Sequence, residues 1–557
     1  MQPIYDIAQL CFLKGIKHAV LSPGSRCAPL TISFARKKEI QKYIIPDERS
    51  AAFIGMGLSR ITQIPTVLIC TSGSAAYNYA PAVAEAYFQN IPLLILTADR
   101  PPEWIDQLDG QTIRQTNIYG NHVKGSYTLP VETNHPDAAW QVERMVNEAI
   151  NLAAQFPKGP VHINIPLREP FYPKGEITFS DTLKIIESTE SSAILSDKTK
   201  TVLAKELNQY KKILVVAGQS VLNRELTEAL KSLSIPVVTD VISNHSFPGS
   251  IRHHDLFLTS SKNEEVLKPE LVISFGNSVI SKSLKTFLRK NKPSAHWHIL
   301  EAGAVADTFQ SLTRHIQVTP LYFFREMLLG LWNPDLVATK EITAFNKTWK
   351  EAETSVSGKA EVFLKNENAF SEFEVVYKAM NALPNQSLLH LANSMPVRYA
   401  NYVGIENSTI EVISNRGTSG IDGVISTAYG TALTTDKLVT VITGDMSFLY
   451  DRNAFWNNYL PPNLRIIIIN NHGGGIFRMI DGPASQPEGE EYFVTRQNLT
   501  AENTLKDFDL DYIQVNDRTS FDKALNEFFQ TSGKSKVMEV MTDGLLNTEV
   551  WKKFKAI

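Results

Sequence analysis

The feature that most constrains the fold is a series of short, continuously apolar runs that alternate with helical stretches. Runs that are apolar at every position indicate strands covered on both faces. Their alternation with helices predicts an α/β fold of three domains, each a mostly parallel sheet flanked by helices. The expected strands are 18–21, 66–70, 93–97 and 161–165 in the first segment, 213–217, 236–241, 271–275 and 296–300 in the second, and 387–391, 410–413, 438–443, 464–470 and 536–541 in the third.

Two connections interrupt this alternation and indicate where domains end. Residues 174–200 are polar and rich in Ser and Thr, and residues 340–370 are charged and helix-prone. A length of 557 residues is compatible with three or four domains. We therefore expect a first domain at 1–180, a central domain at 181–360 and a third domain at 361–557.

The composition argues against several classes of protein. A net charge of −3 provides no basic surface for a nucleic-acid partner. The cysteines, Cys11, Cys27 and Cys70, have no metal-site spacing, which is typical of free thiols in a reducing compartment. The N-terminus has the pattern of an amphipathic helix rather than a signal peptide, and no apolar run approaches the ~18 residues of a membrane span. We expect a cytoplasmic protein without membrane insertion.

Polar residues follow two successive expected strands of the third segment. Asp445 comes just after the run 438–443, and Asn471 and Gly473 come just after the run 464–470. If these strands are neighbours, the two side chains and the glycine carbonyl meet at one sheet edge, because ligands bind beyond the carboxyl ends of parallel strands. Three oxygen ligands suit Mg²⁺, with phosphate oxygens and water completing its octahedron. The pattern predicts a site for a metal and a diphosphate.

Other interpretations of the same residues exist. Asp445 could be a helix N-cap, and the glycines at 473–475 a flexible loop. The letters HGGG at 472–475 also occur in the oxyanion hole of lipases, but the G-x-S-x-G motif that lipases need is absent from the chain. The metal site is favoured because both of its halves stand at the ends of successive strands.

Several motifs together resemble one family of thiamin-diphosphate (ThDP) enzymes. The pair Gly-Asp at 444–445 and Asn-Asn at 470–471 resembles the ThDP-binding motif, although Met446 stands where a glycine is usual. The stretches SPGSR, DER, TADRPPE and SNRGTSGIDG resemble 2-succinyl-5-enolpyruvyl-6-hydroxy-3-cyclohexene-1-carboxylate (SEPHCHC) synthases of menaquinone biosynthesis. They stand at 22–26, 47–49, 97–103 and 414–423.

The resemblance implies a fold, a cofactor and a reaction. The domains would be a pyrimidine-binding, a central and a diphosphate-binding domain, with ThDP and Mg²⁺ or Mn²⁺ held between the first domain of one subunit and the third domain of another. At least a homodimer is implied, and a dimer of dimers, a homotetramer, is common. The implied reaction decarboxylates 2-oxoglutarate and adds the succinyl carbanion to isochorismate in 1,4 fashion, which gives SEPHCHC and CO₂.

The resemblance also assigns residues to the cofactor. Glu48 matches the glutamate that faces N1′ of the aminopyrimidine and promotes loss of the C2 proton, and its pKa would be raised by burial. The alternative is a surface glutamate paired with Arg49. Ile421 matches the apolar residue that supports the bent cofactor, with a core isoleucine as the alternative. The other matching residues are Ser419, Gly420, Ser447, Phe448, Ile476 and Phe477 for ThDP, and Asp445, Asn471 and Gly473 for the metal.

Substrates with several carboxylates need cations, and the arginine fork binds carboxylates in a bidentate manner. By resemblance, Ser394 and Arg398 hold the distal carboxylate of the succinyl group, while Arg416 meets a substrate that the pattern does not specify. Catalytic roles are implied for Ser25, Arg26 and Arg416 beside Glu48. The family's usual asparagine is replaced by Gly110. The residues matched to the isochorismate side are Ser25, Arg26, Arg100, Gln111 and Lys282.

Two rival functions remain open at this stage. One is another ThDP-dependent 2-oxoacid decarboxylase or carboligase, such as an acetolactate synthase-like enzyme, which needs no clamp like Ser394 and Arg398. The other is a non-catalytic ThDP-binding scaffold, which would be expected to lack Glu48 or Asp445. The histidines His122, His162 and His254 show no ligand spacing, so we expect structural roles for them.

Overall fold

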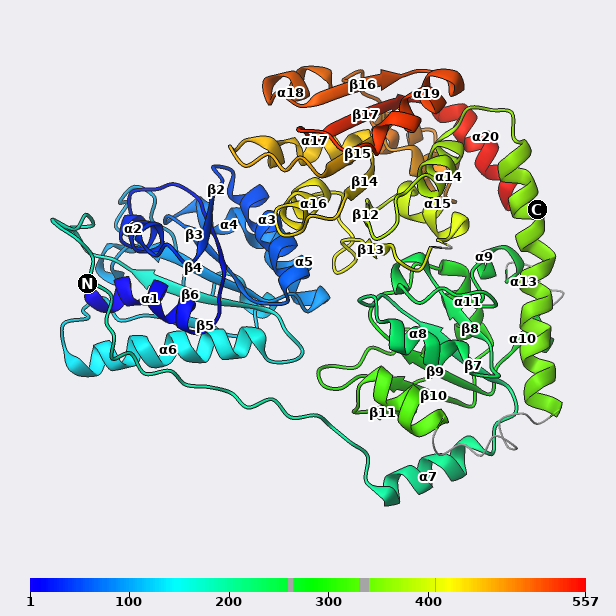
Figure 1. Cartoon of the computed structure of the whole chain (residues 1–557), viewed down its shortest axis with the longest axis horizontal. Helices are drawn as coiled ribbons and strands as arrows, with labels where there is room; N and C mark the ends of the chain where they lie inside the picture. The colour runs from blue at the N-terminus through cyan, green and yellow to red at the C-terminus, as the bar shows by residue number, and fades with distance from the viewer. Residues whose placement is uncertain (259–263, 330–339, 406) are drawn as a thin grey trace.

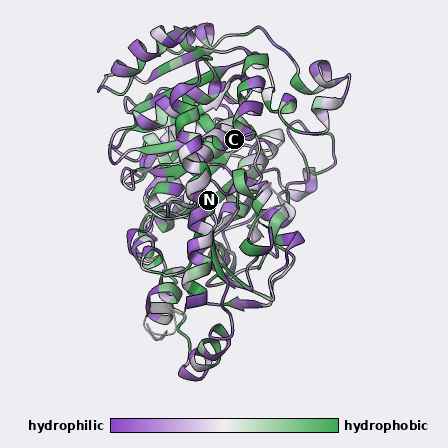
Figure 2. Ribbon diagram, turned by 90° about the vertical axis from the view of Figure 1, so that its right-hand side faces the viewer, coloured by the Kyte–Doolittle hydropathy of each residue, from purple (hydrophilic) through white to green (hydrophobic). Residues whose placement is uncertain are grey.

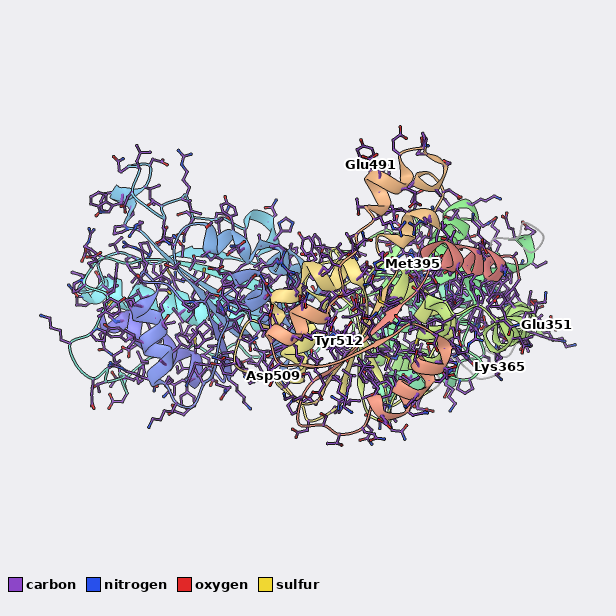
Figure 3. All side chains as sticks on the ribbon, turned by 90° about the horizontal axis from the view of Figure 1, so that it is seen from above. Glu351, Lys365, Met395, Glu491, Asp509 and Tyr512 are labelled. Carbon is purple, nitrogen blue, oxygen red and sulfur yellow. The ribbon has the colours of Figure 1, made fainter. Side chains whose placement is uncertain are left out.

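Three parallel β-sheets follow one another along the chain in a computed structural model that describes residues 1–258, 264–329, 340–405 and 407–557. Each sheet carries helices on its faces (Figure 1). Seen from above, the first sheet lies at one end of the molecule and the other two lie toward the opposite end (Figure 3). The α/β class and the parallel sheets predicted from the sequence are confirmed.

The first sheet is built from strands buried on both faces. Helices α1, α2 and α6 pack on one face, and α3 and α5 pack on the other. The short helix α4 (Ser74–Asn78) precedes α5. The strand order is β2 (Gln41–Ile44), β1 (His18–Leu21), β3 (Thr66–Cys70), β4 (Leu93–Asp99), β6 (Pro160–Pro166), β5 (Ser126–Thr128), and the helices are α1 (Gln2–Leu13), α2 (Ala28–Arg36), α3 (Glu48–Thr62), α5 (Ala80–Gln89) and α6 (Pro136–Ala154).

The second sheet has five strands and forms the centre of the middle domain. The long helix α13 packs along it and reaches toward the third domain (Figure 1). The strand order is β11 (Arg314–Ile316), β10 (Ala295–Ile299), β9 (Leu271–Phe275), β7 (Ile213–Ala217), β8 (Val237–Thr239), and the helices include α7 (Asp197–Leu207), α8 (Arg224–Lys231), α9 (His254–Phe257), α10 (Glu264–Leu267), α11 (Lys282–Lys290) and α13 (Lys340–Asn366).

The third sheet repeats the architecture of the first. Its central strand pair, β14 and β15, is parallel, with Gly444 opposite Ile469. The strand order is β13 (Glu411–Ile413), β12 (Leu388–Leu391), β14 (Val439–Gly444), β15 (Leu464–Asn470), β17 (Lys536–Met541), β16 (Asp511–Val515), and the helices are α14 (Glu372–Asn381), α15 (Met395–Val403), α16 (Val424–Ala432), α17 (Asp445–Tyr450), α18 (Glu502–Asp507), α19 (Arg518–Phe528) and α20 (Gly544–Lys555).

The strands predicted from apolar runs are all present, with ends that shift by one or two residues. The strands β2, β5, β11 and β16 are not among the expected strands. Each lies at the edge of its sheet and is only partly buried, so its sequence lacks a continuous apolar run. Hydrophobic residues concentrate on the interior strands and hydrophilic ones on outer helices and loops (Figure 2).

The first and third sheets share one hydrophobic core through α3 and α16. Glycines permit this contact: a Cβ on Gly57 would lie 2.1 Å from the Thr427 carbonyl oxygen, and one on Gly430 would lie 2.0 Å from that of Ile54. Backbone therefore packs on backbone, which only glycine allows at these positions. The contact occurs within one chain, whereas the resemblance implies domains from two subunits.

The chain between the first and second sheets is an extended connection from 167 to 196 (Figure 1). At about 3.3 Å per residue it could span roughly 100 Å. The expected domain boundary near 180 lies in this connection, and the one near 360 lies inside α13. The three domain ranges stay predictions. In the described part of the chain, no helix is both long and apolar enough to cross a bilayer.

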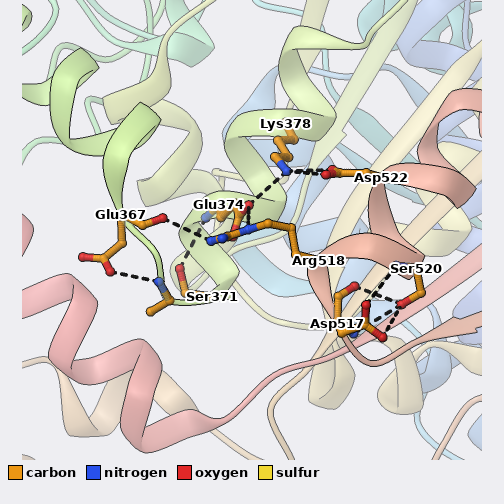
Figure 4. A network of polar contacts seen from close by, with 9 residues as sticks. Glu367, Ser371, Glu374, Lys378, Asp517, Arg518, Ser520 and Asp522 are labelled. Atoms are coloured by element: carbon orange, nitrogen blue, oxygen red, sulfur yellow. Dashed lines mark hydrogen bonds and ion pairs between the residues drawn. The ribbon is translucent and has the colours of Figure 1, made fainter.

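A charged network joins α14 to α19 in the third domain (Figure 4). The Glu374 carboxylate, 8% exposed, accepts two hydrogen bonds from the Arg518 guanidinium, at 2.6 and 2.9 Å. Lys378 lies 3.0 Å from the same carboxylate and donates a 2.7 Å hydrogen bond to Asp522. Because Glu374 is buried and binds Arg518 through two hydrogen bonds, its interactions are stronger than that of Asp522.

Replacement of Glu374 by alanine should destabilise the protein by about 2 kcal/mol, because it strands two cations that a buried carboxylate now satisfies. The matched control Asp522→Ala removes a half-exposed partner and should cost about 0.5 kcal/mol. Urea titrations of both variants measure the difference. Equal destabilisation by the two variants would contradict this interpretation of the network.

Candidate active site

Asp445 lies at the carboxyl end of β14, as its first residue beyond the strand. Its side chain is 3% exposed and accepts a 2.7 Å hydrogen bond from Gln497 Nε2. Burial raises the pKa of Asp445 to about 6, so a nearby cation would favour its charged form. Gly444 is the N-cap of α17, with no side-chain cap bond, so the alternative that Asp445 is this cap is wrong.

Asn471 follows the neighbouring strand β15, and its side chain is held in a defined orientation. Its Nδ2 donates to the carboxylate of Glu372, while its Oδ1 accepts a 3.1 Å hydrogen bond from the Gly473 N–H. Glu372 starts α14 and is buried, which raises its pKa to about 7. The Glu372 carboxylate accepts this hydrogen bond, so the atom of the Asn471 amide that faces it is the nitrogen and the other is the oxygen.

The donor set at this sheet edge fits a hard divalent cation. It contains one carboxylate from Asp445, one amide oxygen from Asn471 and the carbonyl of Gly473, all just beyond the carboxyl ends of two adjacent parallel strands. A Cβ on Gly473 would lie 2.7 Å from the Val494 carbonyl oxygen, so the loop needs glycine there. Within the described ranges, no group of three or more His, Cys, Asp or Glu side chains could hold a metal. Oxygen donors with a single carboxylate suit Mg²⁺ bound together with phosphate.

Glu48 begins α3 at the other side of the domain contact. Asp47 is the N-cap, and burial raises the pKa of the half-buried Glu48, while a hydrogen bond with Asn78 lowers it. Arg49 donates to the Tyr450 carbonyl at 2.6 Å, with its guanidinium 4.7 Å from the Tyr450 ring centre. Arg49 is thus engaged with the end of α17 rather than with Glu48.

A second contact joins the N-cap of α3 to the 3-10 turn Arg452–Phe455, which follows α17. Asn453 Nδ2 donates to the Asp47 carboxylate at 2.7 Å. Asp47 and Arg49, the two sequence neighbours of Glu48, therefore both bond to residues 450–453, which follow Asp445 in the sequence. The start of α3 therefore lies against the end of α17 and the 3-10 turn that follows it, at the interface between the first and third sheets.

Ile421 lies in the turn before α16 and is 40% exposed, so it is not an ordinary core isoleucine. Ser447 Oγ donates to the Ile421 carbonyl at 2.5 Å and thereby ties the turn to α17. Ser419 has a φ of 61°, while Gly420 accepts a hydrogen bond from Asn393 through its carbonyl. A bulky apolar side chain that is exposed here can support the ring system of a bound ligand.

Three further residues expected at the cofactor differ in their accessibility. The Phe448 ring is 1% exposed and belongs to the core shared by the two sheets, so only its backbone could reach a ligand. Ile476 and Phe477 are partly buried on the turn Gly475–Arg478. The Phe477 ring lies 5.8 Å from that of Phe493.

Two arginines in the third domain lie close together. Arg398 donates to the Ser394 carbonyl, one helical turn earlier, as its spacing predicted. Burial lowers the pKa of Arg398, and the charge of Arg416 lowers it further. Arg416 donates to Asn393 Oδ1 at 2.8 Å. Two neighbouring guanidinium groups, both largely buried, favour an anionic ligand with more than one carboxylate.

The expected isochorismate side is less well assembled. Arg26 is 8% exposed and donates to the Leu167 carbonyl at 2.8 Å, with its guanidinium over the Phe171 ring. Arg100 holds the following loop through Asp109 and the Gly110 carbonyl. Ser25 and Gln111 are exposed, and Gln111 adopts a φ of 57°.

Lys282 begins α11 and is exposed. One turn later, Lys285 is half-buried, and its pKa is lowered by burial and by the nearby Arg416, while Asp240 raises it. Lys285 is therefore a cation of the middle domain near Arg416, and no sequence pattern favours it over Lys282.

Sequence reasoning also missed Asn393, Glu372 and Gln497. Asn393 lies two residues beyond the end of β12, so the rule that ligands gather at strand ends could have found it. Glu372 and Gln497 carry no local signal, because they reach Asn471 and Asp445 from distant parts of the chain. Of the expected structural histidines, His162 is fully buried, hydrogen-bonds Thr97, and has a pKa lowered by burial to about 3.

Comparisons with known proteins identify the family of this chain. Residues 6–118 match the family model described as the thiamine pyrophosphate enzyme, N-terminal TPP binding domain, and residues 192–391 match the middle domain of thiamine pyrophosphate. The SEPHCHC synthase of Cytophaga hutchinsonii is 50% identical over 100% of this chain and 98% of its own. Those of Flavobacterium johnsoniae and Porphyromonas gingivalis are 39% and 36% identical over 99% and 97% of this chain, and 97% and 94% of theirs.

Replacement of Asp445 by alanine should weaken Mg²⁺-dependent ThDP binding by about 100-fold or more, since even residues behind a metal ligand contribute 10- to 100-fold. Isothermal titration calorimetry with and without Mg²⁺ measures this. Asp436→Asn, at an exposed aspartate of the same domain, is the control and should bind normally. Unchanged ThDP affinity in Asp445→Ala would rule out the metal site.

Proposed function

The chain belongs to the SEPHCHC synthase family, and from this premise we propose that it decarboxylates 2-oxoglutarate and joins the succinyl unit to isochorismate, releasing CO₂ and SEPHCHC in menaquinone biosynthesis. The observation that carries the proposal is the full-length identity of 50% to a SEPHCHC synthase, in a chain that has Glu48 at the start of α3 and Asp445 at the start of α17. A scaffold without catalysis would not need both residues.

The cofactor would be held from both sides of the interface between the first and third sheets. Asp445, Asn471 and Gly473 would bind Mg²⁺ or Mn²⁺ and, through it, the diphosphate of ThDP, while Ile421 would support the bent cofactor. Bound ThDP supplies an electron sink for the loss of CO₂ from a 2-oxo acid. The protein contributes orientation, charge and exclusion of water.

Glu48 would share a proton with N1′ of the aminopyrimidine. Its half-buried position raises the carboxyl pKa, which brings it closer to neutral pH than an exposed glutamate. A carboxyl group whose pKa lies nearer the working pH is a better proton-sharing partner. The role that we assign to Glu48 is the exchange of this proton with N1′, which would favour the imino tautomer of the aminopyrimidine.

The arginine pair gives the substrate class. Arg398 and Arg416 lie close enough to lower the Arg398 pKa, and 2-oxoglutarate brings two carboxylates that would offset two positive charges. Ser394 would assist Arg398. Pyruvate has no distal carboxylate, so an acetolactate synthase-like reaction would leave one guanidinium without a partner.

The isochorismate side would use Ser25, Arg26, Arg100, Gln111 and Lys282. Arg26 now points to the Leu167 carbonyl, so its use on substrate requires the side chain to turn. Gly110 cannot supply the side-chain contact that the family's asparagine would make.

We further propose that two subunits exchange domains, so that the first domain of one subunit completes the site of the other in a homodimer or homotetramer. The extended connection at 167–196 has the length for either pairing. The buried free cysteines and the substrates suit the cytoplasm.

Incubation of the protein with ThDP, Mg²⁺, 2-oxoglutarate and isochorismate should yield SEPHCHC, identified by mass spectrometry. Pyruvate in place of 2-oxoglutarate should give no comparable product. Arg398→Met should raise the KM for 2-oxoglutarate by about 10- to 100-fold, since each charged hydrogen bond contributes about 1.5–3 kcal/mol. Efficient turnover of pyruvate and an unchanged KM in this variant would favour the rival lyase.

Glu48→Gln should lower kcat by about 100- to 10,000-fold, the range for lost acid–base catalysis, with a normal fold and ThDP affinity. Full activity would remove the assigned role. Mixed with inactive Asp445→Ala subunits, this variant should regain part of its activity if domains are exchanged, because one hybrid site is then intact. Absence of any recovery in verified hybrid dimers would exclude the exchange.

A further inference from the structure

A buried carboxylate of the first domain binds the loop that carries Arg416. Glu85 lies on α5, is 1% exposed, and has both carboxylate oxygens occupied. Oε1 accepts from the Gly417 N–H at 2.7 Å and from Gln89 Nε2 at 2.5 Å, and Oε2 accepts from the Thr418 N–H at 2.6 Å and the Thr418 hydroxyl at 2.5 Å. Three of these four donors belong to the loop that follows Arg416.

The loop backbone also sits directly on α5. A Cβ on Gly417 would lie 2.7 Å from the Glu85 carbonyl oxygen and 3.1 Å from Glu85 Oε1. No other residue could make this approach without displacing backbone. The position of the loop is therefore fixed both by the shape of α5 and by the charge-assisted hydrogen bonds of Glu85.

The other two domains hold the same loop from different directions. In the middle domain, Ser278 Oγ donates to the Arg416 carbonyl at 2.9 Å. In the third domain, Asn393 accepts from the Arg416 guanidinium at 2.8 Å and donates to the Asn415 carbonyl at 2.7 Å. Arg416 thus lies where three domains meet, and Glu85 is the first domain's contribution.

We propose that Glu85 is a positioning residue for Arg416, which sets the guanidinium at the distance from Arg398 that a substrate with several carboxylates requires. The proposal rests on the proposed role of Arg416 in substrate binding. Glu85 itself is closed off from substrate by its four donors, so it acts on Arg416 through the position of the loop and through its negative charge. A misplacement of about 1 Å at a substrate-binding group can lower the rate about 100-fold.

The holoenzyme of Glu85→Gln tests this. The glutamine amide has only one acceptor oxygen, so its NH₂ would face the N–H group of Gly417 or Thr418. Two donors cannot bond to each other, and the loop would be displaced. For the substrate affected by Arg416→Met, kcat/KM should fall about 10- to 100-fold, with ThDP affinity within about threefold of normal. Thr418→Val removes one of the four hydrogen bonds and should give a smaller loss, of about 2- to 10-fold, without the risk of misfolding.

A matched control is Asp6→Asn, at another buried carboxylate of the first domain. Asp6, 4% exposed, holds a different loop through the Ser180 N–H at 3.0 Å and hydroxyl at 2.7 Å. This variant should lose thermal stability yet keep the KM of both substrates. A similar loss of kcat/KM in Asp6→Asn would mean that Glu85 acts on stability alone, and would overturn the proposal.

A double-mutant cycle separates this inference from the proposed function. If Glu85 acts through Arg416, Glu85→Gln or Thr418→Val should change kcat/KM by less than about twofold in the Arg416→Met background. Losses that simply multiply would overturn the positioning role while leaving the role of Arg416 intact. Unchanged kinetics in Arg416→Met alone would overturn both.

Discussion

The contact between α3 and α16 is the interaction on which the rest of the structure depends. Gly57 and Gly430 let the two helices touch through their backbones, so the first and third sheets share a single core. Three residues expected at the cofactor are tied to these rigid elements. Glu48 begins α3, Asp445 begins α17, and Ile421 lies in the turn just before α16. Sites built on such elements keep their geometry better than sites on loops.

The second constraint is electrostatic. Asp445 and Glu372 are buried carboxyls with raised pKa values, while Arg398 and Arg416 are largely buried cations whose pKa values burial lowers, and the charge of Arg416 lowers the Arg398 pKa further. Isolated buried charges are costly, and evolution tolerates them where a ligand supplies the opposite charge. A divalent cation bound together with a diphosphate would satisfy the buried carboxyls, and a dicarboxylate substrate would satisfy the two arginines.

The sequence was informative where local pattern and function coincide. Central strands are buried on both faces and show continuous apolar runs, and Asp445 and Asn471 stand just beyond two of them. Edge strands such as β16 are half-exposed and lack that pattern. Glu85, Glu372 and Gln497 could not be found, because their partners lie 333, 99 and 52 positions away. Family resemblance selected Arg26 and Lys282, whose side chains here face the interior and the solvent.

The most direct measurement is a crystal structure of the protein with ThDP and Mg²⁺. We expect the Glu48 carboxyl to lie within hydrogen-bond distance of N1′ of the aminopyrimidine. We also expect Asp445, Asn471 and the Gly473 carbonyl to coordinate the metal, at about 2.0–2.1 Å. ThDP bound elsewhere, or Glu48 remote from its aminopyrimidine in every pairing of first and third domains, would contradict the account.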